Sequence, residues 1–301
     1  MLESRNRIIF VKFLEQNKPK ILNMNEYLEQ QPTQELDNPC ISITKTSKSF
    51  KKKVVLQEVS IQLQKGIAYG LLGKNGAGKS TLINLIAGLT TPSSGSVLIN
   101  EEEAHLLSAS NKHKLGIMTE QLPLQEELTG WEQLWMVGLF YNLSKYDLKP
   151  RIESLFDYFF DDRDSMKKRI GTYSTGMRKK IGLMAAVLHN PDILILDEPF
   201  SGIDPVSATR MIDFFTNWMN PNRLLLISSH NLDQVEKMVS HLIVVHQHQI
   251  IYSDTVQHFT GQGLEKMETK LYEMLHGASK TLDDVAWLLP NYESKAQTET
   301  V

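Results

Sequence analysis

The sequence predicts an α/β protein with a parallel sheet, an antiparallel β subdomain and a helical insert. Apolar runs of strand length at Ile67 to Leu72, Ile193 to Leu196 and Leu224 to Ile227 alternate with stretches of helical periodicity. A glycine-rich loop, residues 73–80, directly follows the first of these runs and precedes a helical pattern. This strand–loop–helix order is the setting that a phosphate-binding loop requires.

The composition narrows the class of protein. The chain has 301 residues with 41% hydrophobic content, enough for one large domain or two small ones. A net charge of −3 gives no basic field, so we expect no nucleic-acid partner. The single cysteine, Cys40, excludes an internal disulfide. No apolar run approaches the ~20 residues of a spanning helix, and we expect a soluble cytosolic chain.

The chain divides into three predicted parts. Residues 1–38 are polar and broken by prolines, so we expect an extension with little fixed structure. Residues 39–254 form the main domain, and its helical insert covers about 122–190. Residues 255–301 are expected to be a C-terminal helical extension that weakens into a polar tail.

The elements of the main domain follow from local patterns. Short alternating runs from Ile41 to Leu63, turning at Lys51 to Lys53, predict the strands of the antiparallel subdomain. A helix is predicted from about Asp204 to Asn217. The run Leu242 to Val245 predicts a further strand, and Ile250 to Tyr252 is expected to pair with it as a hairpin.

The phosphate loop reads Gly-Lys-Asn-Gly-Ala-Gly-Lys-Ser and fits the template GxxxxGK[ST]. Its glycines let backbone amides turn inward toward phosphate oxygens, and the following helix adds its positive end. Lys79 supplies a charge for the β- and γ-phosphates, and the Ser80 hydroxyl is a ligand for Mg²⁺. The alternative is a glycine-rich turn that matches by chance. The nucleotide-binding residues expected here are Gly73, Lys74, Asn75, Gly76, Ala77, Gly78, Lys79, Ser80 and Thr81.

Two acids follow the second buried run, in the sequence Ile-Leu-Ile-Leu-Asp-Glu-Pro. Carboxylates at the carboxyl end of a parallel strand face the crevice where ligands bind. We expect Asp197 to hold Mg²⁺ and Glu198 to polarise the attacking water as a general base. The alternative is a strand that ends in acids for solubility.

With these motifs in order, the chain resembles the ATP-binding cassette (ABC) ATPases from about Ile41 to Ser253. Tyr173 to Met177, Tyr-Ser-Thr-Gly-Met, stands where the family carries its Leu-Ser-Gly-Gly-Gln signature. Ser174 and Gly176 match, while Thr175 places a β-carbon where backbone approaches phosphate. The form Tyr-Ser-x-Gly-Met is typical of the exporting branch. The resemblance implies that Ser174, Thr175 and Gly176 meet the γ-phosphate bound by a second cassette. Without the other motifs, Ser174 is an ordinary helix cap.

Four further positions match the family. The resemblance implies that Gln121 contacts Mg²⁺ and the water, that Asp204 in the loop Ser201 to Asp204 lies at the dimer interface, and that His230 contacts the γ-phosphate. Phe50 lies where the family stacks an aromatic ring on adenine. The alternatives are a surface glutamine, a structural histidine, and a core phenylalanine on an early strand.

The resemblance implies an ATP-hydrolysing subunit of an ABC transporter that uses ATP and Mg²⁺. Two identical cassettes would close head-to-tail around two ATP molecules. An integral membrane permease would receive the helical insert near Gln121 to Trp131 and hold the chain at the inner face of the membrane. The permease would carry the substrate, and the resemblance to the exporting branch implies export. One alternative is a non-transport ABC ATPase acting on ribosomes or nucleic acid. Another is a regulatory cassette without turnover, against which Glu198, His230 and Lys79 argue.

Two charged groups are assigned to the surface. Asp157, Asp161, Asp162 and Asp164 are irregularly spaced for a calcium loop, so a solvated loop is expected. Arg178, Lys179 and Lys180 are expected on an exposed helix face near Ser174.

Overall fold

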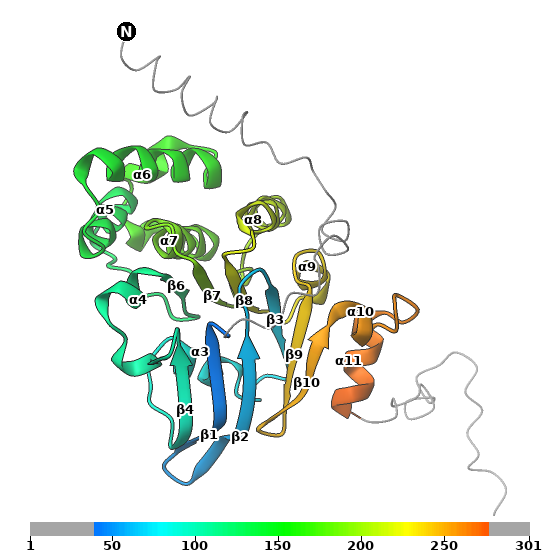
Figure 1. Ribbon diagram of the computed structural model, residues 1–301. Helices are drawn as coiled ribbons and strands as arrows, with labels where there is room; N and C mark the ends of the chain where they lie inside the picture. Colours follow the sequence, from blue (N-terminus) through cyan, green and yellow to red (C-terminus); the bar gives the residue numbers. More distant parts are fainter. Residues whose placement is uncertain (1–38, 277–301) are drawn as a thin grey trace, which may run out of the picture. The chain divides into compact units, whose positions relative to one another are not determined.

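The core is a six-stranded sheet in the order β10-β9-β3-β8-β7-β6. The computed structural model describes residues 39–276 (Figure 1). Neighbouring strands pair in parallel, except that β10 returns antiparallel beside β9 as the predicted hairpin. The strands are β3 (Ala68–Leu72), β6 (Leu115–Met118), β7 (Ile193–Asp197), β8 (Leu224–Ser228), β9 (His241–His246) and β10 (Gln249–Thr255).

A second sheet is antiparallel, with the order β2-β1-β4-β5. Ile41 pairs with both Leu63 of β2 and Ile99 of β4, so β1 lies in the middle of this sheet. The predicted α/β class, with a parallel sheet and an antiparallel subdomain, is therefore confirmed. The strands are β1 (Ile41–Phe50), β2 (Lys53–Leu63), β4 (Ser94–Ile99) and β5 (Glu102–Glu103).

The parallel strands are buried on both faces, and alternate residues serve two different cores. Ile193 and Ile195 of β7 join the core that contains helix α3 (Lys79–Ile86) and the antiparallel sheet. Leu194 and Leu196 join the other core, which includes residues of the helical insert. Because side chains alternate along a strand, a continuous apolar run is what two buried faces require.

The helical insert gathers on one side of the molecule, away from β1, β2 and β4 (Figure 1). A capping box between Thr129 and Glu132 begins α5, and Phe156 of α6 is fully buried in the core. The insert consists of α5 (Gly130–Phe140), α6 (Lys145–Phe159), the 3₁₀ turns Arg163–Lys167 and Ile170–Thr172, and α7 (Thr175–Val187).

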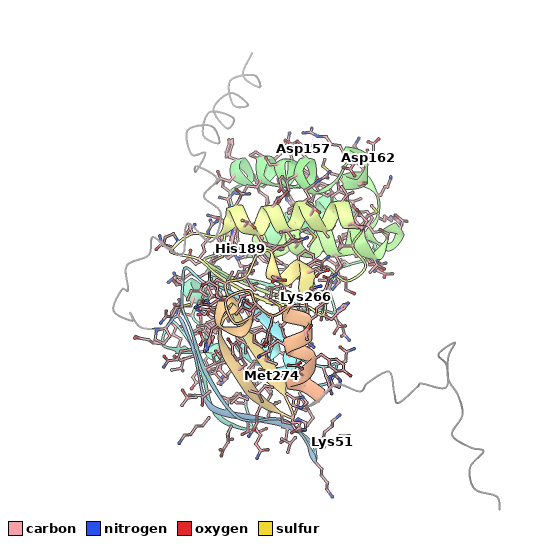
Figure 2. The ribbon with its side chains drawn as sticks, turned by 90° about the vertical axis from the view of Figure 1, so that its right-hand side faces the viewer. Lys51, Asp157, Asp162, His189, Lys266 and Met274 are labelled. Carbon is pink, nitrogen blue, oxygen red and sulfur yellow. The ribbon has the colours of Figure 1, made fainter. Side chains whose placement is uncertain are left out.

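The acidic cluster lies at the outer edge of this insert, where Figure 2 labels Asp157 and Asp162. Asp157 belongs to α6 rather than to a loop, and it forms an ion pair with Arg163. The remaining three acids also have basic partners, Arg210, Lys168 and Lys167. The cluster is therefore a set of surface ion pairs, which contribute little individually to stability.

The remaining helices complete the described chain. They are the 3₁₀ turn Ala104–Leu106, α4 (Ala109–His113), α8 (Pro205–Trp218), α9 (Leu232–Glu236), α10 (Val256–Phe259) and α11 (Met267–His276). The predicted extension 1–38 and the predicted polar tail after residue 276 lie outside the described residues, and the domain boundaries stay predictions. Between residues 39 and 276, no helix is both long and apolar enough to cross a membrane.

Candidate nucleotide-binding and catalytic site

The phosphate loop joins β3 to α3, as the sequence predicts. Gly78 has φ 113°, and a Cβ at this position would lie 2.8 Å from Leu56 Cδ2 and 2.9 Å from the Val55 carbonyl oxygen. Only glycine satisfies both the conformation and the space. The first amides of α3 have no partner within the helix, as in any helix, and no side chain caps them. These amides and the positive helix end form an anion-binding site.

Lys79 directs its ammonium group into this loop. Its Nζ donates to the carbonyl oxygens of Gly73 (2.8 Å) and Lys74 (3.3 Å), and the residue is buried. Burial lowers the pKa of Lys79. The carboxylates of Glu198, Asp197 and Glu120 oppose that shift. Among the described residues, Lys79 hydrogen-bonds to main-chain carbonyls, and such a cation can turn to a phosphate without breaking an ion pair.

Asp197 ends β7 and is almost completely buried, at 2% exposure. It faces Ser228 across the parallel pair of β7 and β8, and the Ser228 hydroxyl donates to Asp197 Oδ1. Ser228 carries no local sign of this role in the sequence. The signal was available only in three dimensions, because the strand register brings residue 228 beside residue 197.

Glu198 and His230 meet at the ends of neighbouring strands. His230 Nδ1 lies 2.8 Å from Glu198 Oε2. Glu198 has φ 49°, the left-handed region that non-glycine residues adopt at a cost. Its amide donates to the Ser228 hydroxyl (3.0 Å) and to the Ser228 carbonyl (3.2 Å). The structure thus joins two residues that are 32 positions apart, with the carboxylate largely covered and the imidazole exposed.

The signature segment lies at the beginning of α7. The Ser174 hydroxyl accepts from the Met177 amide (3.2 Å) and caps the helix. Ser174 and Thr175 are exposed. The Thr175 methyl packs against Gly202, where a Cβ would come within 2.9 Å of it. The β-carbon that departs from the family pattern therefore contacts the chain's own Ser201 to Asp204 loop.

Three further predicted residues, Asp204, Gln121 and Phe50, are all exposed. Asp204 caps α8 by accepting from the Ser207 amide, a hydrogen bond that lowers its pKa. Gln121 is exposed just beyond the end of β6. Phe50 is 50% exposed, and Lys48 Nζ lies 4.9 Å from its ring centroid. The core interpretation of Phe50 is therefore wrong.

The expectation that Arg178, Lys179 and Lys180 form an exposed face is also wrong. Lys179 and Lys180 are buried, at 6% and 9% exposure. Lys180 Nζ lies 5.4 Å from the centroid of the Phe160 ring, and Lys179 Nζ donates to the Glu198 carbonyl. The missed signal is that α7 continues with apolar residues on every side, which is typical of a helix buried all round.

The two-sheet fold and the phosphate loop define a P-loop nucleotide-binding domain. The ABC transporter family matches residues 56–201. NatA, an ABC transporter ATP-binding protein of Bacillus subtilis (strain 168), is 34% identical over 72% of this chain and 90% of its own length. The chain belongs to the ABC transporter family, as an ATP-binding protein.

Two further comparisons agree with this assignment. The linearmycin resistance ATP-binding protein LnrL of the same Bacillus strain is 33% identical over 68% of this chain and 65% of its own length. A solved structure of the ATP-binding subunit of an ABC transporter superposes with a TM-score of 0.69 at 26% identity. That match covers 78% of this chain and 98% of the solved chain.

Proposed function

We propose that the chain is the ATP-hydrolysing subunit of an ABC transporter and that ATP binding closes two copies head-to-tail. The observation that carries hydrolysis is the contact between Glu198 and His230, 2.8 Å apart at the carboxyl ends of β7 and β8. In an open parallel sheet this edge is where ligands bind. The phosphate loop follows β3, the strand beside β8, at the same edge.

The nucleotide would be held mainly through its phosphates. The amides of residues 73–81 and the N-terminus of α3 supply neutral donors, and Lys79 supplies the charge. Phe50 would stack on adenine through its exposed face. Stacking tolerates different bases, so the phosphates carry most of the specificity in this arrangement.

The donor set fits Mg²⁺, which prefers oxygen ligands and keeps several of its waters. Ser80 offers a hydroxyl, Asp197 a buried carboxylate and Gln121 an amide oxygen. The buried carboxylate already accepts a hydrogen bond from Ser228, which fixes its orientation. When bound, the ion would neutralise charge on the β- and γ-phosphates.

Glu198 would orient the attacking water and accept its proton, since its carboxylate is held at the strand end with one oxygen on His230. The exposed imidazole of His230 would contact the γ-phosphate on its other side. Gln121 would complete the contact between the ion, the water and the helical insert. Positioning and charge stabilisation provide most of the catalysis in phosphoryl transfer.

The second half of each site would come from another copy of the chain. Ser174 and Thr175 are exposed at the beginning of α7, where amides and a hydroxyl are aimed outward. Asp204 lies in the neighbouring exposed loop. Because Glu198, His230 and Lys79 are all present in one chain, a homodimer would have two complete sites.

Transport would pass through a separate integral membrane subunit, which would hold this chain at the inner face of the membrane. The Tyr-Ser-x-Gly-Met form favours export, a role that would also suit a relative named for linearmycin resistance. Purification from native membranes should bring down a polytopic partner. Co-purification of ribosomes or nucleic acid instead would favour the non-transport ABC ATPase.

Hydrolysis is tested with the Glu198→Gln variant. We expect phosphate release to fall at least 100-fold, the usual range for loss of a general base, while ATP binding persists. Unchanged phosphate release would remove Glu198 from its proposed role. Absence of hydrolysis by the wild-type dimer with its membrane partner present would refute the function itself.

A further inference from the structure

The second turn of α7 carries a buried cation that faces the catalytic edge of the sheet. Lys179 is only 6% exposed, and its Nζ donates to the main-chain carbonyl of Glu198 at 3.0 Å. The acids that attract it are Glu120, Asp197 and Glu198. A buried ammonium group is unfavourable without compensation, and here it has a hydrogen bond to a carbonyl and the attraction of nearby carboxylates.

We propose that Lys179 is a positioning residue that fixes the backbone of Glu198 so that its carboxylate reaches His230. This inference rests on the proposed ATPase function. It concerns a contact within one chain, between the helix that begins at Ser174 and the residue expected to activate water. Lys179 contacts neither nucleotide nor water in this arrangement and acts through Glu198.

Glu198 needs such support for two reasons. Its φ of 49° lies in the left-handed region, which is unfavourable for a residue with a β-carbon. It also precedes Pro199, and the proline ring restricts the preceding residue toward extended backbone. A residue in an unfavourable conformation persists only when its surroundings hold it there.

Both peptide groups of Glu198 are held from outside. On the amide side, Ser228 of β8 accepts through its hydroxyl and its carbonyl. On the carbonyl side, the Glu198 oxygen accepts from Lys179 Nζ (3.0 Å) and from the Ser201 amide (3.3 Å). The hydrogen bonds from the Glu198 amide to Ser228 fix only the N-terminal side of this residue. The Ser201 amide belongs to the turn that follows Glu198, whereas the ammonium group ties this end of the residue to α7. Lys179 therefore helps to hold the backbone from which the carboxylate extends to His230.

The chain offers a matched control in the next residue. Lys180 is also buried in α7, but its Nζ lies over the Phe160 ring, 5.4 Å from the ring centroid. Lys179→Met and Lys180→Met each remove one buried charge from the same helix turn. A loss of ATP turnover that both variants share measures the packing of α7. The difference in turnover between the two variants measures the contact of Lys179 with Glu198.

The experiment compares ATP turnover, ATP affinity and local backbone protection in Lys179→Met, Lys179→Arg and Lys180→Met. We expect Lys179→Met to lower kcat roughly 10- to 100-fold, as loss of a supporting partner typically does, with ATP affinity within about threefold of wild type. Lys179→Arg keeps a donor and should recover most of the rate. Lys180→Met should keep the wild-type kcat.

Two further measurements separate positioning from general structure. In the Glu198→Gln background, Lys179→Met should cause no additional loss in long single-turnover incubations, because both changes act on one group. Hydrogen exchange of residues 197–201 should rise in Lys179→Met and not in Lys180→Met. Any of three results would overturn the proposal. They are a wild-type kcat in Lys179→Met, a loss of rate in the Glu198→Gln background as large as the loss in the wild-type background, and unchanged hydrogen exchange of residues 197–201. The exchange result stands even where the wild-type chain hydrolyses no ATP, an outcome that would refute only the proposed function.

Discussion

Ser228→Ala removes a hydroxyl that makes two hydrogen bonds at the centre of the site. Ser228 is fully buried, and its hydroxyl both donates to Asp197 Oδ1 and accepts from the Glu198 amide. Removing the hydroxyl does not strand that amide, because it also bonds to the Ser228 carbonyl at 3.2 Å. The net loss is therefore one hydrogen bond to a buried carboxylate, which contributes about 1.5–3 kcal/mol.

This loss should appear as a lower melting temperature. For a domain of this size, 1 kcal/mol corresponds to a shift of about 2–4 °C, so a loss of about 2 kcal/mol lowers Tm by roughly 4–8 °C. Scanning calorimetry without nucleotide measures the shift. Ser229→Ala is the control, since the Ser229 hydroxyl accepts from the nearby Asn231 amide and, within residues 39–276, makes no hydrogen bond to a carboxylate. Equal Tm values for Ser228→Ala and wild type would refute the account of how Asp197 is held.

Three other predictions follow from the same structure. Lys79→Ala should weaken ATP binding roughly 10- to 100-fold in fluorescence titrations, since a charge-assisted hydrogen bond is lost; wild-type affinity would contradict the phosphate-loop assignment. Phe50→Ala should weaken ATP binding about tenfold, while Phe50→Tyr should keep wild-type affinity because it keeps the stacking surface. Equal ATP affinities of Phe50→Ala and wild type would exclude Phe50 from adenine binding. Burial lowers the pKa of His189 to about 4, while the ordinary value in the unfolded chain is about 6.5. Stability from this group is present above pH 6.5 and lost as the pH falls toward 4, so denaturation should show about 2 kcal/mol less stability at pH 5 than at pH 7.5. His189→Gln should remove that difference, and an unchanged pH dependence would contradict the burial account.

Much of the fold follows from local sequence. The runs at β3, β7 and β8 predict buried parallel strands because each is apolar on both faces, and each leads directly into a predicted site segment. The phosphate loop and the Asp197–Glu198 pair are also local, since each is defined by a few consecutive residues after a strand. These parts can be located without knowledge of the rest of the chain.

The contacts that support the site depend on tertiary packing. Ser228 reaches Asp197 through strand register, and Lys179 reaches Glu198 because α7 packs on the sheet. Neither serine nor lysine is unusual at its position in the sequence. The prediction of an exposed basic face on α7 failed because charge was given more weight than the apolar residues that continue this helix.

In the proposed arrangement, one chain supplies only half of each site. This arrangement is tested most directly by sedimentation velocity of the Glu198→Gln variant with Mg²⁺ and saturating ATP, because slow turnover should preserve the ATP-bound state. The account predicts a monomer without nucleotide and a dimer with ATP. A variant that binds ATP and remains monomeric would contradict it.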